Sequence, residues 1–161
     1  MNISEYNRCV DEAADGLYRF LLKNTKEHEL AQDLVQEAFM RLWERRKEVQ
    51  AGKGKSWLFT TAYRAMIDHF RKFNRMETLE VEKQRHESAV NGYSDLKEVL
   101  NKAVDQLPDM QRSVVLLRDY EGYSYREIGE ITGLSESQVK VYIFRARLFL
   151  KNFIGKPEVV I

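Results

Sequence analysis

The sequence predicts an all-α protein of two small helical domains joined by a flexible linker, with a helix-turn-helix in the second domain. Two observations favour helices. Apolar residues recur at three- and four-residue spacing along most of the 161 residues, and the only prolines are Pro108 and Pro157. A third observation divides the chain, because this periodicity breaks between residues 74 and 95. We therefore expect domains at residues 1–73 and 96–161 and a linker at 74–95.

The first segment is expected to form three helices. One follows the apolar residues between Val10 and Leu21, and a second covers about residues 27–48, with a polar outer face available to a partner. A glycine- and lysine-containing loop at 50–56 then precedes a third helix, which is expected to begin at Trp57 with Ser56 as its cap. Between residues 74 and 95 five acids stand against three cations, which is typical of a mildly acidic linker.

The second segment is expected to form four helices. Apolar spacing predicts a helix from Leu96 to Leu107, and Pro108 suits the first turn of another that runs to about Asp119. The last two helices lie within residues 124–151, and their starts are marked by two sequence patterns.

These two starts predict a helix-turn-helix. Ser124 with Glu127, and Ser135 with Gln138, form capping-box patterns in which side chains satisfy the free amides of a helix start. Gly133 lies between them and can adopt the positive φ that ends the first helix, leaving a turn of about three residues.

The last helix carries cations and no acid from Ser137 to Lys156. Its outer face is expected to hold Lys140, Val141, Phe144 and Arg145. Phosphates complement such a charge, so the helix-turn-helix is a DNA-binding hypothesis. The alternative is a solvated cationic helix end that complements the helix dipole.

A second basic zone runs from Arg45 to Arg75, where nine cations stand against Glu48 and Asp68, a net charge of +7. On the third helix a mixed stripe combines an aromatic ring with polar and cationic groups: Trp57, Thr61, Arg64, Asp68 and Arg71. Such a stripe suits single-stranded nucleic acid, because bases stack on aromatic faces while cations neutralise the backbone. The alternative for Trp57 alone is a core anchor.

Catalytic, metal and cofactor sites are not expected. His28, His69 and His86 lie far apart without ligand-like neighbours, and the single Cys9 can form no internal disulfide. The loop at 50–56 lacks the spacing of a nucleotide-binding P-loop. No stretch approaches the ~20 apolar residues that span a bilayer. We expect a cytoplasmic, non-enzymatic protein with no metal, cofactor or small-molecule substrate, and not a membrane protein.

Three segments together follow a family pattern over nearly the whole chain. Ala31–Phe39 (AQDLVQEAF) is similar to an A-E-D-L-V-Q-E-x-F helix, and Trp57–Arg71 is similar to a W-L-Y-x-x-A…I-D-x-x-R helix. Leu107–Leu150 is similar to an L-P…R…G-x-S-Y-x-E-I…S-x-x-x-V-K…R-A-R-x-x-L domain. In order and spacing the chain resembles the bacterial RNA polymerase sigma factors of the extracytoplasmic-function (ECF) type, in the sigma-70 family.

The resemblance implies a protein that binds core RNA polymerase and directs promoter-specific transcription initiation by recognising the −10 and −35 elements of promoter DNA. It implies a core polymerase-binding group: Asp33, Leu34, Gln36, Glu37 and Phe39. It implies a −10 group: Lys53, Lys55, Trp57, Thr61, Arg64 and Arg71. It implies a −35 group: Lys140, Val141, Phe144, Arg145 and Arg147. An anti-sigma factor is a further partner that the resemblance implies.

The chain departs from the family pattern in three places, one of which is the loop before Trp57, where the usual Phe and Arg are absent. Thr60, Thr61 and Arg64 stand where the family more often has Arg, Ile and Asn, and Gly129 replaces the usual Ala. The glycine should cost about 0.5–1 kcal/mol of helix stability unless close packing recovers it. The alternative function is a stand-alone helix-turn-helix regulator of transcription, whose N-terminal helices would serve dimerisation or sensing instead of polymerase docking.

Overall fold

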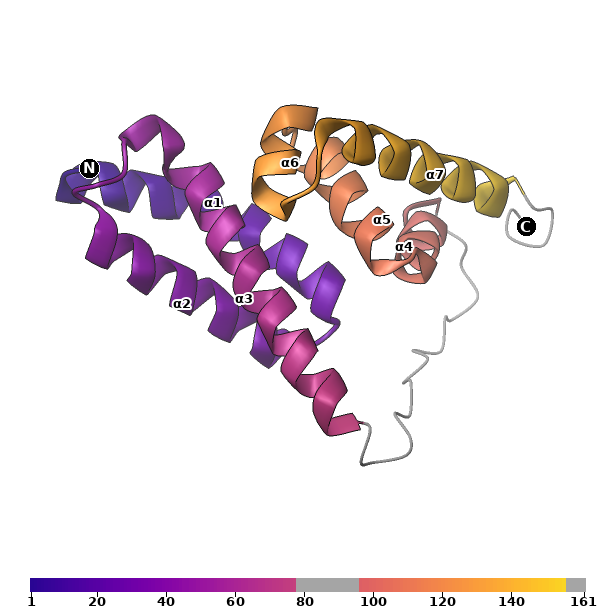
Figure 1. Cartoon of the computed structure of the whole chain (residues 1–161), viewed down its shortest axis with the longest axis horizontal. Helices are drawn as coiled ribbons and strands as arrows, with labels where there is room; N and C mark the ends of the chain where they lie inside the picture. The colour runs from indigo at the N-terminus through magenta and orange to yellow at the C-terminus, as the bar shows by residue number, and fades with distance from the viewer. Residues whose placement is uncertain (78–95, 156–161) are drawn as a thin grey trace.

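The computed structural model describes residues 1–77 and 96–155, and every regular element in these ranges is helical (Figure 1). The first group is α1 (Ile3–Thr25), α2 (His28–Arg45), the 3₁₀ turn η1 (Ala51–Lys53) and α3 (Gly54–Glu77). The second group is α4 (Leu96–Gln106), α5 (Asp109–Val115), the π-helical turn η2 (Leu116–Tyr120), α6 (Tyr125–Thr132) and α7 (Glu136–Ile154). The prediction of an all-α protein with two helical domains is confirmed. Residues 78–95 of the predicted linker lie outside the described ranges, whereas residues 74–77 continue α3.

The start of α3 differs from its prediction. The helix begins at Gly54 and not at Trp57, and Ser56 lies inside its first turn, where the hydroxyl donates to the Lys53 carbonyl at 3.1 Å. Gly54 is buried against α1, and a Cβ there would lie 2.5 Å from Cys9 Sγ. The glycine therefore serves the close approach of α3 to α1, which the loop interpretation did not foresee.

The buried side chains form a core that runs through both helical groups. The apolar faces predicted for the first three helices are the buried ones, and the largest fully buried side chains in this group include Leu17, Phe20, Leu42, Phe59 and Met66. The same cluster continues into the second group through Val114, Leu116, Leu117, Tyr123, Ile128, Ile131, Val139 and Ile143. The two domains are therefore joined by packing as well as by the chain between them.

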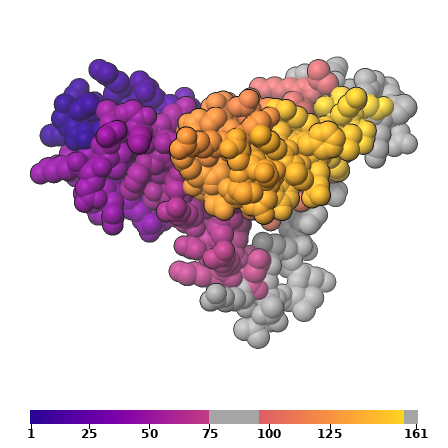
Figure 2. Space-filling model, turned by 45° about the horizontal axis from the view of Figure 1, so that its top comes forward, coloured from indigo at the N-terminus to yellow at the C-terminus, as the bar shows by residue number. Residues whose placement is uncertain are grey.

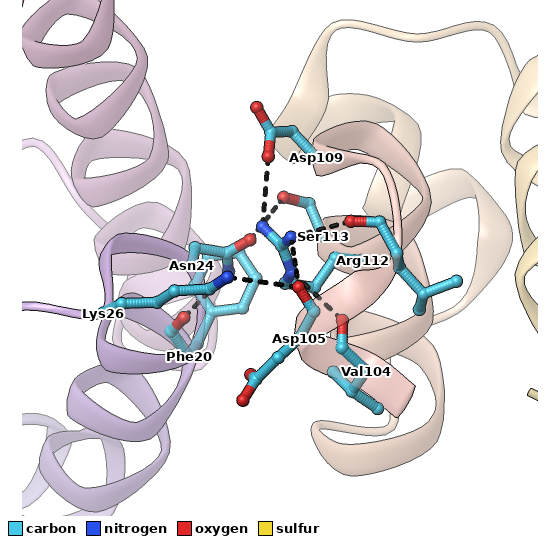
Figure 3. A network of polar contacts seen from close by, with 9 residues as sticks. Phe20, Asn24, Lys26, Val104, Asp105, Asp109, Arg112 and Ser113 are labelled. Carbon is cyan, nitrogen blue, oxygen red and sulfur yellow. Dashed lines mark hydrogen bonds and ion pairs between the residues drawn. The ribbon is translucent and has the colours of Figure 1, made fainter. Parts of the chain in front are cut away.

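A buried arginine closes the corner between α4 and α5 (Figure 3). The Arg112 guanidinium donates to the carbonyls of Val104 at 3.2 Å, Asp105 at 3.1 Å and Leu107 at 2.7 Å, and it pairs with the Asp109 carboxylate at 3.1 Å. These carbonyls lie at or just after the end of α4, where backbone carbonyls lose their helical N–H partners, and Val104 O also accepts from the Leu107 amide at 3.1 Å. Burying this cation is tolerable because the helix end and the carboxylate supply its hydrogen bonds.

The predicted helix-turn-helix is confirmed. Ser124 Oγ accepts from the Glu127 amide at 3.1 Å, and the Glu127 carboxylate accepts from the Ser124 amide at 3.0 Å. Ser135 and Gln138 make the same reciprocal pair at 3.1 and 2.9 Å. Gly133 ends α6 with a φ of +81°, as a left-handed C-cap requires. Local side-chain chemistry therefore sets both starts and the turn between them.

Close packing accounts for the glycine at position 129. A Cβ there would lie 2.8 Å from the Leu134 carbonyl oxygen in the turn, nearer than side-chain carbons approach such atoms. The turn therefore folds tightly over α6 at this position.

The two helical groups pack against each other along an extended contact. α6 lies against α3 and α5 contacts α1, and the space-filling view shows the orange α6 region lying directly on the purple first domain (Figures 1 and 2). We call this contact, which also includes residues 121–123, the domain interface. The sequence pattern predicts two separate domains and does not indicate this interface.

Candidate nucleic-acid interface

The outer face of α7 combines cations with exposed apolar side chains. Val139, Ile143 and Ala146 are buried against the rest of the domain, which turns the opposite face of the helix to solvent. Lys140, Val141, Phe144 and Arg145 of the predicted −35 group lie on that face, and Phe144 is 68% exposed. Leu148 is a further exposed apolar residue on the same face, which the sequence analysis did not single out.

Arg147 differs from the rest of its predicted group because an acid already pairs with it. Its guanidinium donates to the two Asp119 carboxylate oxygens at 2.5 and 3.3 Å. This hydrogen bonding raises the pKa of Arg147, so the charge is fixed and partly neutralised. Its position toward η2 places it at the border of the exposed α7 face.

An aromatic ring of α6 supports the start of α7. The Tyr125 ring lies 5.7 Å from Lys140 Nζ and 4.7 Å from the Arg118 guanidinium carbon. Such cation–π contacts hold cations in place without neutralising them. Arg118 also donates to the Tyr123 carbonyl at 2.9 Å, which ties the chain before α6 to η2.

The predicted −10 group lies along η1 and α3. Lys53, Lys55, Arg64 and Arg71 are exposed, whereas Trp57 and Thr61 are half-buried. Trp57 packs against the core but keeps part of its ring accessible, so it combines both interpretations offered by the sequence. Arg64 and Arg71 also line an open cleft of about 190 Å³, whose opposite wall is Ile131, Thr132 and Gly133.

The predicted polymerase-binding group divides between surface and core. Asp33 and Gln36 are exposed on α2, and Glu37 is half-exposed and pairs with Arg41 at 2.5 Å. Leu34 is only 5% exposed and Phe39 packs against the core, so these two side chains support α2 from behind.

Two large apolar side chains that were not predicted to be part of a site extend this surface of α2. Met40 is 64% exposed, and Trp43 is also exposed. Trp43 is held by the Tyr6 ring, with centroids 5.0 Å apart, and by Arg46, whose guanidinium carbon lies 3.8 Å from the Trp43 centroid. The signal was present in the sequence, because Asp33, Gln36, Met40 and Trp43 follow one another at helical spacing.

Within residues 1–77 and 96–155 no cluster of three His, Cys, Asp or Glu side chains is arranged to hold a metal ion. Burial raises the pKa of the Cys9 thiol, which disfavours a reactive thiolate. Among the helices in the described ranges, none combines the length and apolarity needed to cross a bilayer.

The fold and its exposed faces define a two-domain helical DNA-binding protein whose second domain ends in a helix-turn-helix. Residues 9–76 match the family model of sigma-70 region 2, and residues 97–150 match that of sigma-70 region 4. The ECF RNA polymerase sigma factor SigM of Bacillus subtilis is 36% identical over 147 residues, covering 88% of this chain and 90% of SigM. The RNA polymerase sigma factor YlaC of the same species is 28% identical, covering 91% and 95% of the two chains.

Solved structures agree on the fold. The sigma factor RpoE from Bartonella quintana, in complex with the anti-sigma factor NepR, matches with a TM-score of 0.78 and 24% identity, over 96% of this chain and 99% of RpoE. CnrH, in complex with the cytosolic domain of CnrY, matches with a TM-score of 0.68 and 22% identity, over 95% and 89% of the two chains.

The chain belongs to the ECF family of RNA polymerase sigma factors. It is therefore a promoter-specificity subunit that binds core RNA polymerase and promoter DNA, and its family comprises sigma factors and not enzymes. The match of residues 9–76 to region 2 argues against the alternative function of a stand-alone regulator, because such a protein does not need this domain.

Proposed function

We propose that three surfaces divide the work of initiation: α2 docks on core polymerase, η1 and α3 engage the −10 element, and α7 reads the −35 element. One observation carries the proposal. The capped α7 buries its apolar side and exposes Lys140, Phe144 and Arg145 on the other, and after Glu136 in its first turn it carries no acid. The functional division keeps the boundaries 1–73, 74–95 and 96–161.

On α7, the residue types match the chemistry of base edges in the major groove. Arg145 and Lys140 can donate to the O6 and N7 acceptors of guanine, and the apolar Val141 and Phe144 suit the methyl group of thymine. Arg147 is paired with Asp119 and lies beside the exposed face, which suits a phosphate contact that fixes the helix on the duplex.

On η1 and α3, Lys53, Lys55, Arg64 and Arg71 supply charge for the DNA backbone. The accessible part of the Trp57 ring, with Thr61 one turn further along α3, offers a surface for an unstacked −10 base. This division separates contacts that neutralise phosphate from contacts that receive a base.

On α2, Asp33, Gln36 and Glu37 present polar groups to the polymerase, and Leu34 and Phe39 hold the helix in position from behind. We add Met40 and Trp43 to this surface, because exposed large apolar side chains beside polar ones are typical of interface anchors, and Trp43 is supported by the Tyr6 ring.

An anti-sigma factor is proposed as a regulatory partner, because two similar solved structures are of complexes, the sigma factor RpoE with the anti-sigma factor NepR and CnrH with the cytosolic domain of CnrY. Action with RNA polymerase implies a cytoplasmic protein. No cofactor or small-molecule substrate is required by the proposed roles.

Run-off transcription with core polymerase and a genomic promoter library, with and without this protein, tests the function. Glu37→Lys should weaken binding to core polymerase, whereas Glu12→Lys, the same charge change at an exposed position of α1, should not. Normal polymerase binding by Glu37→Lys would remove α2 from the interface.

The −35 assignment is tested with the same promoters. Arg145→Ala should reduce discrimination among −35 variants by about 1–3 kcal/mol. Arg126→Ala, which removes an exposed cation of α6, should leave discrimination intact. Unchanged discrimination in Arg145→Ala would remove Arg145 from the reading group.

A further inference from the structure

Glu136 and Lys140 lie one turn apart at the start of α7, yet they do not form the ion pair that their spacing favours. An acid four residues before a lysine is the better orientation for such a pair on a helix. At the same spacing on α2, Glu37 and Arg41 pair at 2.5 Å. Among the described residues no ion pair joins Lys140 to Glu136. Another contact therefore holds the Lys140 side chain.

That contact is with the ring of Tyr125 at the start of α6. The ring centroid lies 5.7 Å from Lys140 Nζ, within the range of a cation–π interaction. An aromatic face attracts the ammonium group through its quadrupole but carries no net charge, so it orients the cation without neutralising it. Lys140 also stays exposed. Its charge is therefore available to an anion, whereas a pair with Glu136 would offset much of it.

The Tyr125 ring is itself held in place. Tyr125 is the first residue of α6 and directly follows Ser124, whose capping box sets the backbone there. The Arg118 guanidinium carbon lies 4.7 Å from the ring centroid, and Arg118 is anchored by its bond to the Tyr123 carbonyl at 2.9 Å. The ring is half-buried and packs against the core. A fixed ring restricts the positions of Lys140 before DNA binds, which lowers the cost of ordering it.

Tyr125 also acts on Arg147, the cation two turns beyond Lys140. The hydrogen bond with Asp119 is the main cause that raises the pKa of Arg147, and Tyr125 adds to it in the same direction. Cations from η2 and from two turns of α7 are thus associated with one uncharged ring. Such a grouping leaves a local positive potential that complements phosphate and the acceptor edges of bases.

We propose that Tyr125 is a positioning residue for recognition of the −35 element, because its ring keeps Lys140 apart from Glu136 and leaves the ammonium group free for DNA. The proposal rests on the assignment of α7 to the −35 element. It adds to the −35 group a residue of α6 that acts through Lys140 and not by its own contact with a base.

Promoter binding by core polymerase carrying this protein tests the role of the ring. The probe is a promoter recovered by run-off transcription, beside a copy whose −35 element is scrambled. Tyr125→Leu keeps an apolar side chain but removes the ring, and it should weaken binding to the intact promoter about threefold to tenfold, with little change on the scrambled copy. Tyr125→Phe keeps the ring and should bind like the parent. Equal losses in Tyr125→Leu and Tyr125→Phe would overturn the proposal.

The competing acid gives a sharper test. In a Glu136→Gln background, where the amide cannot pair with Lys140, Tyr125→Leu should weaken binding by less than about twofold. In a Glu130→Gln background, the same change at an exposed acid of α6, the full loss should remain. Tyr125→Leu should also have no further effect once Lys140→Ala is present. A full loss in the Glu136→Gln or the Lys140→Ala background would show that the ring does not act through Lys140.

A measurement on the free protein separates positioning from general destabilisation. The ring current of Tyr125 should shift the ε-methylene protons of Lys140 upfield in the proton NMR spectrum. The shift should persist in Tyr125→Phe and disappear in Tyr125→Leu, while helical circular dichroism is retained in both. A Lys140 signal that is the same in the parent and in Tyr125→Leu would overturn the contact.

Failure of this role is distinguishable from failure of the proposed function. If Arg145→Ala relaxes −35 discrimination while Tyr125→Leu leaves promoter binding unchanged, Tyr125 has no positioning role and α7 keeps its assignment. If Arg145→Ala, Lys140→Ala and Tyr125→Leu all leave −35 discrimination unchanged, the assignment of α7 is wrong and the role of Tyr125 falls with it.

Discussion

The helix-turn-helix and the domain interface are held by interactions of very different range along the chain. In the helix-turn-helix each capping box joins residues three apart, such as Ser135 and Gln138. At the domain interface Asn24 meets Ser113 across 89 positions, and Arg19 meets Glu121 across 102. Local contacts form whenever the helix forms, whereas distant contacts require the whole chain to be folded. The first region is therefore specified by short patterns and the second by tertiary packing.

The largest expected effect is in the core beneath α7. Ile143→Ala should lower the free energy of unfolding by about 2–5 kcal/mol, because it removes buried carbon and leaves a cavity. Urea denaturation measures this loss. Val141→Ala, on the exposed side of the same helix, should change the same quantity by about 0.5 kcal/mol or less. Equal losses in the two variants would contradict the assigned faces of α7.

The polar pair at the domain interface should give the next largest effect. Ser113→Ala leaves the buried Asn24 Oδ1 without its donor and should cost about 1–3 kcal/mol of unfolding free energy. The double variant Asn24→Ala with Ser113→Ala should cost less than the sum of the single variants, because they share one interaction. Strict additivity in urea denaturation would show that the pair does not couple the domains.

The cap of α7 should contribute less. Ser135→Ala should cost about 1 kcal/mol, because the Gln138 amide loses its acceptor at the helix start. Ser137→Ala, two residues further on and exposed, is the matched control and should have little effect. A loss as large for Ser137→Ala, a change that favours the helix, would show that the loss in Ser135→Ala does not come from the cap.

The smallest effect at neutral pH concerns the Tyr123 hydroxyl, which has no hydrogen-bond partner within the described ranges. Burial raises the pKa of Tyr123 above its usual value near 10. The folded form therefore retains this proton where the unfolded form loses it. Stability should be unaffected by this group below about pH 9 and should fall above pH 10, by up to about 1.4 kcal/mol per pH unit.

Tyr123→Phe isolates this titration. The variant should be as stable as the parent at neutral pH, since no hydrogen bond is lost, and its stability should fall less steeply above pH 10. Burial raises the pKa of Tyr63 in the same direction, so part of the alkaline slope should remain. A slope unchanged by Tyr123→Phe would show that the interface does not shield this hydroxyl.

Helical spacing in the sequence predicted which side of each of the three helices faces solvent. It did not predict every residue that is exposed on that side. On α7 the four outward residues from Lys140 to Arg145 lie where the pattern places them. On α2 the spacing placed Leu34 inward, as observed, whereas the family resemblance grouped Leu34 and Phe39 with exposed neighbours although both pack inward; Met40 and Trp43 were missed. Periodicity gives the direction of a side chain around a helix, but exposure depends on which other helices cover that direction.

The start of α3 and the glycines show the same difference between features set by local sequence and features set by tertiary contacts. The role of Gly133 as the C-cap of α6 was predicted because a left-handed cap depends only on local sequence, and its φ of +81° agrees. Gly54 and Gly16 are needed for contacts with Cys9 and Glu121, and no local pattern identifies those partners. A glycine at a turn can be interpreted from its neighbours, but a glycine at a close approach cannot.

The sequence by itself determined the helices, the two capped starts and the cationic outer side of α7, because these depend on residues within one or two turns of each other. Only the tertiary structure decided that Arg112 closes a helix end, that Glu121 fits over Gly16, and that the two domains share one core. The physical reason is that such contacts combine shape and hydrogen bonding from segments far apart in the chain, and their partners are defined only when those segments meet.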